Sequence, residues 1–440
     1  PVLDGSPFEA WNGETYAYSK YGNKLKDYFD TGFSQNHNVS ISNGTETSHF
    51  RASFGASDNK GVFPNEKLNR INIDLNAGTE LNKWMSIDGK ISLSRTKAED
   101  RPEYGTYGAI NQLMGIPHNV RLDDLKQYST EDAVHVNWYG PSAEIRNPYY
   151  VLHQRHNSDE RWRAFGYYST KISFTDWLHL SAKYAFDYYR TRVQNTNAGD
   201  AYNNETVPSA ITDDKMDRGE ENFFESNAEF ILMGDRQLTE NFRLGFTLGS
   251  NFMYQKFESL SAGVGNMLTK GEWMFNAANL LRTAAETGKE RAMNSVFGSV
   301  QMAWKEYLSL DLTARNDWSS TLPKQNNSFF YPSANLSFVI SDFMKSIDKS
   351  LPSWVTFAKL RLSAAQVGKD TEPYQLYNTY AYKFDNGILT PDKSNVKLND
   401  NLKPEIATSY EAGLDMKFFD NRFGFDFTYY YSKTKNQIMK

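Results

Sequence analysis

Apolar and polar residues alternate along most of the chain. In the segment from Met85 to Ser94, apolar or small residues occupy every second position, and Ser86, Asp88 and Lys90 lie on the other face. This period of two is typical of a β-strand with one face in an apolar environment and the other in water. The pattern predicts about fourteen strands, near residues 37–42, 48–57, 68–77, 84–94, 162–174, 178–190, 222–233, 242–254, 294–304, 308–318, 329–340, 355–366, 409–418 and 423–432.

Three further features distinguish a membrane barrel from a soluble β-sandwich, because both folds show this alternation. Most predicted strands run to about 10–13 residues, which is enough for the roughly 9–11 that cross a bilayer, whereas average strands have about 5–6. Short connections such as 78–83 and 305–307 alternate with long ones, which are 95–161, 191–221, 255–293 and 367–408. Aromatic residues gather at the strand ends, with Trp177, Trp304, Tyr307, Trp354 and Phe419 beside short turns and Trp162, Tyr188, Tyr254, Trp318 and Tyr429 beside long loops. We therefore predict an all-β, antiparallel transmembrane β-barrel with short periplasmic turns and long extracellular loops in a bacterial outer membrane.

Composition agrees with this interpretation. The 440 residues include 48 Lys and Arg against 53 Asp and Glu, a formal net charge of -5 that argues against a basic nucleic-acid-binding surface. Aromatic residues make up 15% of the chain and favour strands and membrane interfaces. The chain has no cysteine, which excludes disulfides and thiolate metal sites.

The predicted topology places both chain ends outside the cell if the short turns are periplasmic. Outer-membrane barrels normally begin and end in the periplasm, so we expect the sequence to be an internal segment of a longer protein. In this interpretation, residues 1–36 form an extracellular segment that enters the barrel, 37–432 form the barrel wall and its loops, and 433–440 begin the next extracellular loop. The first and last strands are then expected not to pair with each other.

Several segments resemble the SusC/RagA family of TonB-dependent outer-membrane transporters of Bacteroidetes. They are YFDTGFSQNHNVSIS at 28–42 followed by NGTE, DNKGVFPN at 58–65, ARNDWSSTLP at 314–323, YPSANLSFVISD at 331–342, KLRLSAAQVGKD at 359–370 and NLKPEIATSYEAGLDMKFFDNRFGFDFTYYYSKTKNQI at 401–438. Asn43 replaces the first glycine of the family's GGTE-like turn, and the similarity is lost in the long loops.

The resemblance implies a barrel of 22 strands with a plugged lumen, of which this chain supplies about fourteen. It also implies a SusD-like surface lipoprotein as a lid and energy coupling through the TonB complex. The plug domain and the segment that contacts TonB are absent from these residues. The resemblance therefore suggests the channel subunit of an active importer, with outer-membrane lipid around the wall and no nucleic-acid partner.

The sequence lacks the common catalytic and cofactor-binding motifs. The sequence has no His-Glu-x-x-His zinc motif, no Gly-x-Ser-x-Gly elbow and no phosphate-binding glycine loop, so we expect neither enzymatic activity nor a cofactor. His153 and His156 have a spacing that can hold a metal on a helix, but we interpret them as solvated loop residues. Asp213, Asp214, Asp217, Glu220 and Glu221 lack the regular spacing of a calcium loop and are interpreted as a solvated acidic loop. No metal site is predicted.

Aromatic residues of the long loops are the predicted solute contacts, because aromatic faces stack on sugar rings and cover apolar side chains. This set comprises Trp138, Tyr139, Tyr149, Trp273, Tyr374 and Tyr377. Charged residues on the polar strand faces are expected to line a wet lumen. The predicted function is import of oligosaccharides or other large nutrients. The alternatives are an oligopeptide importer of the same family and a non-transporting surface adhesion or structural β-protein.

Overall fold

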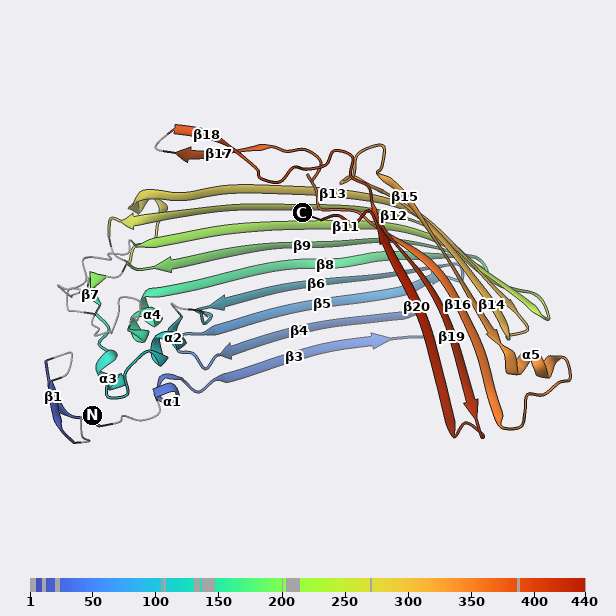
Figure 1. The fold of residues 1–440 in the computed structure, drawn as a ribbon, viewed down its shortest axis with the longest axis horizontal. Coiled ribbons are helices and arrows are strands. Elements are labelled where there is room, and N and C mark those ends of the chain that lie inside the picture. Colours follow the sequence, from blue (N-terminus) through green and yellow to red (C-terminus); the bar gives the residue numbers. More distant parts are fainter. Residues whose placement is uncertain are drawn as a thin grey trace.

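The computed structural model describes residues 5–9, 13–19, 24–103, 105, 108–129, 135–136, 147–199, 201–202, 214–269, 271–385 and 388–439. A single curved sheet of 14 strands dominates the fold (Figure 1). Its strands in chain order are β3 (Phe33–Gly44), β4 (Ser48–Lys60), β5 (Lys67–Asn82), β6 (Met85–Glu99), β8 (Arg155–Thr175), β9 (Leu178–Asn197), β11 (Lys215–Thr239), β12 (Phe242–Met267), β13 (Ala278–Trp304), β14 (Leu308–Ser319), β15 (Ser328–Val339), β16 (Val355–Lys369), β19 (Glu405–Phe418) and β20 (Phe423–Lys435).

Each strand of this sheet pairs antiparallel with the previous and the next one, from β3 at one edge to β20 at the other. The meander predicted from the alternation is therefore confirmed, and every predicted strand has a counterpart. The two edge strands do not pair with each other, so the sheet curves without closing. This agrees with the expectation from the sequence that the first and last strands do not pair with each other.

Several strands continue well beyond the predicted ends. The strands β8, β9, β11, β12 and β13 have 20 to 27 residues each. The ladder between β12 and β13 runs from Phe242 opposite Trp304 to Met267 opposite Ala278, so the prediction of a loop over 255–293 is wrong for most of that range. Beyond the membrane both faces of a strand are wet, so the apolar alternation fades while the backbone pairing continues.

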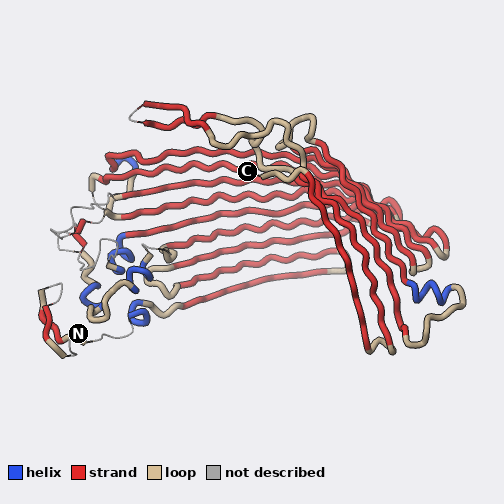
Figure 2. Tube along the Cα trace, viewed as in Figure 1, coloured by secondary structure: helices blue, strands red, loops and turns tan. Residues whose placement is uncertain are grey.

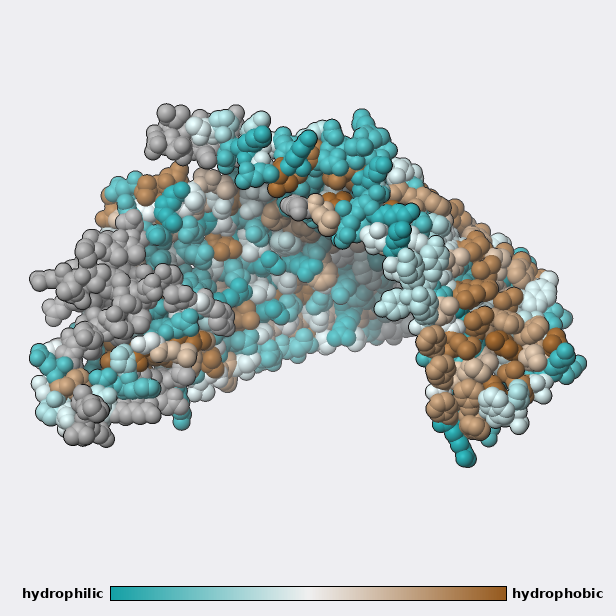
Figure 3. Space-filling model, viewed as in Figure 1, coloured by the Kyte–Doolittle hydropathy of each residue, from teal (hydrophilic) through white to brown (hydrophobic). Residues whose placement is uncertain are grey.

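The register assigns each residue to one face of the sheet. Asp74 lies opposite Ser92, and Ser169 lies opposite both Asp88 and Lys183, so these polar residues share the inner face. Val39, Ile41 and Leu93 lie on the other face and are exposed. Figure 3 shows the hollowed surface over the long strands as mainly hydrophilic, and the surface over the strands from β14 to β20 as mainly hydrophobic. An extended apolar surface on the outside of a curved sheet is what lipid covers.

The short connections lie together at one end of the sheet. The turn between β13 and β14 is tight, with positive φ at Lys305 and Glu306, and the turn between β19 and β20 has positive φ at Phe419, Asp420 and Asn421. Helix α5 (Ile340–Ser346) follows β15 at this same end. None of the helices in the described ranges is long and apolar enough to span a membrane.

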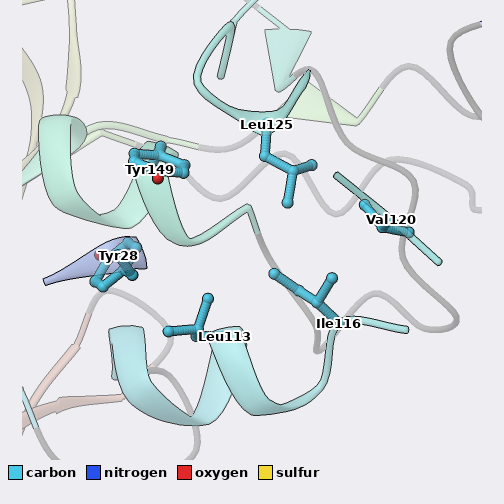
Figure 4. Packing of buried hydrophobic residues seen from close by; sticks show 6 residues of the cluster. All are labelled: Tyr28, Leu113, Ile116, Val120, Leu125 and Tyr149. Atoms are coloured by element: carbon cyan, nitrogen blue, oxygen red, sulfur yellow. The ribbon is translucent and has the colours of Figure 1, made fainter. Parts of the chain in front are cut away.

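The other helices and small strands lie at the opposite end, where Figure 2 shows them clustered beside the long strands. They are β1 (Pro7–Glu9), β2 (Thr15–Ala17), α1 (Lys24–Tyr28), α2 (Ala109–Met114), α3 (Leu122–Leu125), β7 (His135–Val136), α4 (Pro148–Gln154), β10 (Ala201–Tyr202), the 3-10 helix η1 (Phe275–Ala277), β17 (Tyr380–Asp385) and β18 (Ile388–Lys393). Helices α1, α2, α3 and α4 pack around a small apolar core. This core consists of Tyr28, Leu113, Ile116, Val120, Leu125 and Tyr149 (Figure 4).

Candidate solute-binding surface

The inner face of the sheet is lined by paired charges. Arg163 donates to Asp187 with nitrogen–oxygen distances of 2.8 and 2.5 Å, and Arg361 donates to Asp426 at 2.6 Å. His49 lies 3.0 Å from Asp88, which also accepts a hydrogen bond from the Tyr167 hydroxyl at 2.6 Å. These groups are partly exposed and would be costly against lipid. The inner face therefore suits contact with water and a polar solute.

A polar pocket of about 520 Å³ occupies the extracellular end of this face. One side is held by Arg101 and Asn157, whose backbone and side-chain groups exchange hydrogen bonds of 3.0 and 2.9 Å. The Arg101 guanidinium also forms an ion pair with Asp159. We call this cavity the rim pocket.

The rest of the rim pocket combines amides and charges. Asn195, Asn197 and Lys215 line it, and Arg282 lies 3.7 Å from Asp217 across it. Among the described residues, the Asn197 Oδ1 atom is buried without a hydrogen-bond partner, so it can accept a hydrogen bond from water or a solute. The pocket thus offers both donors and acceptors to a hydroxyl-rich or charged ligand.

An aromatic row crosses the inner face below the rim pocket. The rings of Tyr189 and Phe223 stack with centroids 4.8 Å apart and planes at 14°, and the Arg161 guanidinium lies 4.6 Å from the Tyr189 centroid. Phe257 lies opposite Phe223 in the ladder and so shares this face. We call Tyr189, Phe223 and Phe257 the inner aromatic row. The sequence analysis did not predict this row. The signal that could have identified it is the presence of aromatic residues at alternate strand positions that otherwise carry polar side chains.

The loop aromatics predicted to contact a solute have different surroundings. Trp138 and Tyr139 lie outside the described residues. Tyr149 is only 7% exposed and packs in the helical core, with its ring centroid 5.3 Å from that of Tyr28. Tyr374 and Tyr377 are 64% and 68% exposed in the connection between β16 and β19.

Trp273 belongs to the connection between β12 and β13, which folds over the outer face. Its carbonyl oxygen accepts a hydrogen bond of 2.9 Å from Arg218, and Arg218 points outward because it lies opposite Gln194 and Ala262 in the ladders. The backbone of Trp273 is therefore tied to the outside of the wall and not to the rim pocket. Of the six predicted contacts, Tyr374 and Tyr377 present the most exposed rings in the described part of the chain.

The environment of Tyr149 predicts a structural effect of its replacement. Burial raises the pKa of the Tyr149 phenol, and the side chain contributes to the apolar core of α1 to α4. We expect Tyr149→Leu to destabilise this core by about 1–2 kcal/mol, because the smaller side chain leaves part of the space unfilled. Hydrogen exchange of the amides in α2 and α4 measures the effect. Tyr377→Leu is the control, because Tyr377 is exposed. Equal protection of these amides from exchange in the two variants would contradict the packing role of Tyr149.

The interpretation of the two histidines and the acidic cluster as solvated loop residues is wrong for most of them, because His153 lies in α4, His156 in β8, and Asp217, Glu220 and Glu221 in β11. The strand pairing continues through these polar positions, and several of the side chains interact with protein groups. The His156 Nδ1 atom lies 2.9 Å from Asp100, and the His153 ring stacks on Tyr128 with centroids 4.9 Å apart. Burial lowers the pKa of the His153 imidazole, which favours its neutral form. Asp214 accepts a hydrogen bond from the Gly199 amide, and Glu220 pairs with Arg190. Asp213 lies outside the described residues, and within them no group of three or more histidines and carboxylates is arranged to hold a metal ion.

A buried polar network fixes the rim of the wall between β13 and β16. Asp370 is 8% exposed and accepts hydrogen bonds from Arg291 at 2.7 Å, Thr321 at 3.1 Å and Ser319. Next to it, the Asp317 carboxylate accepts hydrogen bonds from Arg315 at 2.8 Å and from Tyr331. Five of these residues lie in the segments 314–323 and 359–370 that carry the family resemblance, so those segments have a structural role here.

Comparison with known families decides the classification. Residues 154–440 match the family model described as TonB dependent receptor-like, beta-barrel. The chain belongs to this family of TonB-dependent receptor-like β-barrels. The TonB-dependent barrel inferred from the SusC/RagA resemblance is thereby confirmed, and the chain is an outer-membrane protein.

Curated relatives include TonB-dependent receptor P3 of Formosa agariphila, with 26% identity over 99% of this chain and 44% of the relative. TonB-dependent receptor SusC of Bacteroides thetaiotaomicron has 22% identity over 99% of this chain and 45% of its own length. The chain therefore spans less than half the length of these relatives.

Solved structures share the fold. The RagAB peptide transporter superposes with a TM-score of 0.74 at 19% identity, over 93% of this chain and 45% of the other. The ferripyoverdine receptor of the Pseudomonas aeruginosa outer membrane superposes less closely, with a TM-score of 0.51 at 11% identity, over 92% and 48%. At these identities the likeness concerns the fold alone.

Proposed function

We propose that this chain forms part of the wall of a TonB-dependent outer-membrane importer whose solute is an oligosaccharide. The observation that carries this proposal is the inner aromatic row beneath the amide-rich rim pocket. Sugar rings have apolar C–H faces that stack on aromatic rings and hydroxyl groups that pair with amides and charged groups. The rim pocket and the row supply these two kinds of contact on one face.

An oligopeptide is the second candidate solute, because charges of both signs surround the rim pocket. Arg101, Arg155, Lys215 and Arg282 lie beside Glu103, Asp159 and Asp217. Such a lining can pair with the termini and charged side chains of a peptide. The name of the RagAB peptide transporter is compatible with this candidate, although at 19% identity it gives no information on the solute of this chain.

The complete importer would include parts and partners beyond this chain. We propose a plug within the lumen, a SusD-like surface lipoprotein over the extracellular rim, and energy supplied by the TonB complex through the N-terminal region of the whole protein. The names SusC and RagAB among the similar proteins support this assignment. Tyr374 and Tyr377 remain proposed contacts to the solute or to the lipoprotein, because both rings are exposed at the rim.

The test uses the complete transporter with its lipoprotein, titrated calorimetrically with neutral oligosaccharides and with oligopeptides of similar mass. We expect Tyr189→Leu to weaken oligosaccharide binding about three- to tenfold, the effect of losing one aromatic contact. Tyr188→Leu is the matched control, because Tyr188 is the adjacent residue and points outward, and it should leave binding unchanged.

Three outcomes would count against an oligosaccharide at this surface. Binding of peptides alone would favour the second candidate, and equal effects of the two tyrosine variants would remove the inner aromatic row from the solute site. Binding of neither class would favour a non-transporting surface role. Replacing Tyr377 by Ala in the same titration tests the predicted loop contacts separately.

A further inference from the structure

The last turn of α4 connects the helical core to the barrel wall, because α4 ends at Gln154 and β8 begins at Arg155. The last four carbonyl oxygens of a helix need donors from outside the helix. In α4 these are the carbonyls of Val151, Leu152, His153 and Gln154, which accept in turn from the Arg155 amide, the Asn65 side chain at 3.3 Å, the His156 imidazole at 3.0 Å and the Ala198 amide at 2.9 Å. Of these four donors, only the imidazole titrates near neutral pH.

The His156 imidazole bridges two acceptors. Its Nδ1 atom lies 2.9 Å from an Asp100 carboxylate oxygen, and its Nε2 atom lies 3.0 Å from the His153 carbonyl oxygen. Carboxylate and carbonyl oxygens only accept hydrogen bonds, and a neutral imidazole carries a single N–H group. The two bonds therefore exist together only when the ring is protonated and positively charged.

The electrostatic surroundings favour the protonated ring. The hydrogen bond to Asp100 raises the pKa of the His156 imidazole above its ordinary value, and the bond to the His153 carbonyl acts in the same direction. The side chain is 46% exposed, so it exchanges protons with the surrounding water. His156 also precedes the membrane-spanning part of β8, which the alternation predicts to begin near Trp162.

The other groups around His156 do not replace this charge. Burial lowers the pKa of the His153 imidazole, and a positive His156 lowers it further, so His153 stays neutral. Arg155, the adjacent residue of β8, keeps its charge over the whole range. Thr196, which lies opposite His156 on β9, is uncharged. Around Asp100 the charged residues form ion pairs, Lys97 with Glu99 and Arg101 with Asp159.

We propose that His156 is a proton-operated clip that holds the helices α1 to α4 to the barrel wall. When the ring loses its proton, the remaining N–H stays with the carboxylate, which is the stronger acceptor. The lone pair of Nε2 then faces the lone pairs of the His153 carbonyl, so an attraction becomes a repulsion. His156 and Asn157 line the rim pocket, so the clip lies at the edge of that pocket. It does not depend on which solute the importer takes.

The direction of the pH effect follows from the raised pKa. The pKa of His156 in the folded protein lies above the value of about 6.5 in an unfolded chain. The stabilisation by the clip is therefore complete below about pH 6.5, and it is lost as the pH rises through the folded pKa. Mildly acidic conditions fasten the last turn of α4, and alkaline conditions release it.

The test measures hydrogen exchange of the amides from Leu152 to Arg155 in the complete transporter, expressed as protection factors at about pH 6 and about pH 9. We expect protection to fall about tenfold between these conditions, the effect of losing one hydrogen bond from a charged donor. His156→Gln keeps a polar side chain without a titrating group and should make the protection independent of pH. Asp100→Asn should move the midpoint of the change to lower pH, because it removes the carboxylate that raises the pKa.

His153→Phe is the matched control. It removes the neighbouring imidazole, keeps a ring against Tyr128 and leaves the backbone carbonyl in place, so its protection should still change with pH. Three results would overturn the proposal: equal protection at both pH values in the unaltered protein, an undiminished change in His156→Gln, or loss of the change in His153→Phe, which would identify His153 as the titrating group. If His156→Gln does not fold, the Asp100→Asn variant decides, and an unshifted midpoint would reject the clip.

Discussion

Replacing Leu248 by Arg should strongly destabilise the barrel wall. Leu248 is 55% exposed and lies on the outward face of β12. It is midway between two outward aromatic residues, Phe242 beside the short turn and Tyr254 at the other end of the predicted membrane strand 242–254. It is therefore near the middle of the apolar layer, where an arginine on the lipid face of a barrel costs about 2–4 kcal/mol. The measurement is the free energy of unfolding of the complete transporter in lipid bilayers, or its folded fraction after refolding into vesicles.

Leu260→Arg is the control on the same strand and the same face. Leu260 is 60% exposed, similar to Leu248, but it lies twelve residues farther along and six beyond Tyr254, an aromatic residue of the kind that marks the membrane–water interface. At that level an added charge is solvated, so we expect a change near zero. Equal destabilisation by the two substitutions would contradict the placement of the bilayer, whatever solute the protein carries.

The membrane-spanning part of the fold could be predicted from the sequence because lipid imposes a rule on every second residue. On β5, Ile71, Ile73 and Leu75 meet lipid while Asn72 and Asp74 meet water, and this contrast identified the strand and its orientation. The rule ends at the membrane surface. Around Thr283 and Glu286 both faces are wet, so nothing in the pattern of side chains showed that β13 continues there.

The candidate site was harder to predict for a related reason. A position in a long loop favours an aromatic residue as a solute contact. An aromatic residue in a loop can equally cover its own core, as Tyr149 does, or belong to a loop on the outer face, as Trp273 does. Pairing across strands brings together Tyr189, Phe223 and Phe257, which are far apart in the sequence. Only the register shows that they share the inner face, because one residue of slip would turn them toward lipid.

Replacing Asp370 by Ala should loosen the rim between β13 and β16. The carboxylate is buried and joins Arg291 on β13, Ser319 at the end of β14 and Thr321 just beyond it. Its removal leaves the partly buried Arg291 guanidinium without this partner, and breaking a buried ion pair by removing one member costs about 3–5 kcal/mol. The loss should be local, because the ladders nearer the short turns do not depend on Asp370. Hydrogen exchange of the amides around residues 319–322 and 370–378 measures it.

Glu372→Ala provides the comparison, since it removes a neighbouring acidic residue from an exposed ion pair. Glu372 lies 3.5 Å from Lys289, and both side chains are largely solvated, so the expected cost is about 0–1 kcal/mol. The connection from β16 also contacts β13 through a 3.2 Å hydrogen bond from the Glu290 amide to the Tyr374 hydroxyl. If Asp370 fixes the base of this connection, its loss should expose the Glu290 amide to exchange, whereas Glu372→Ala should not. Similar exchange in the two variants would mean that the ladder alone holds the rim, and that the carboxylate at position 370 contributes little to the position of Tyr374.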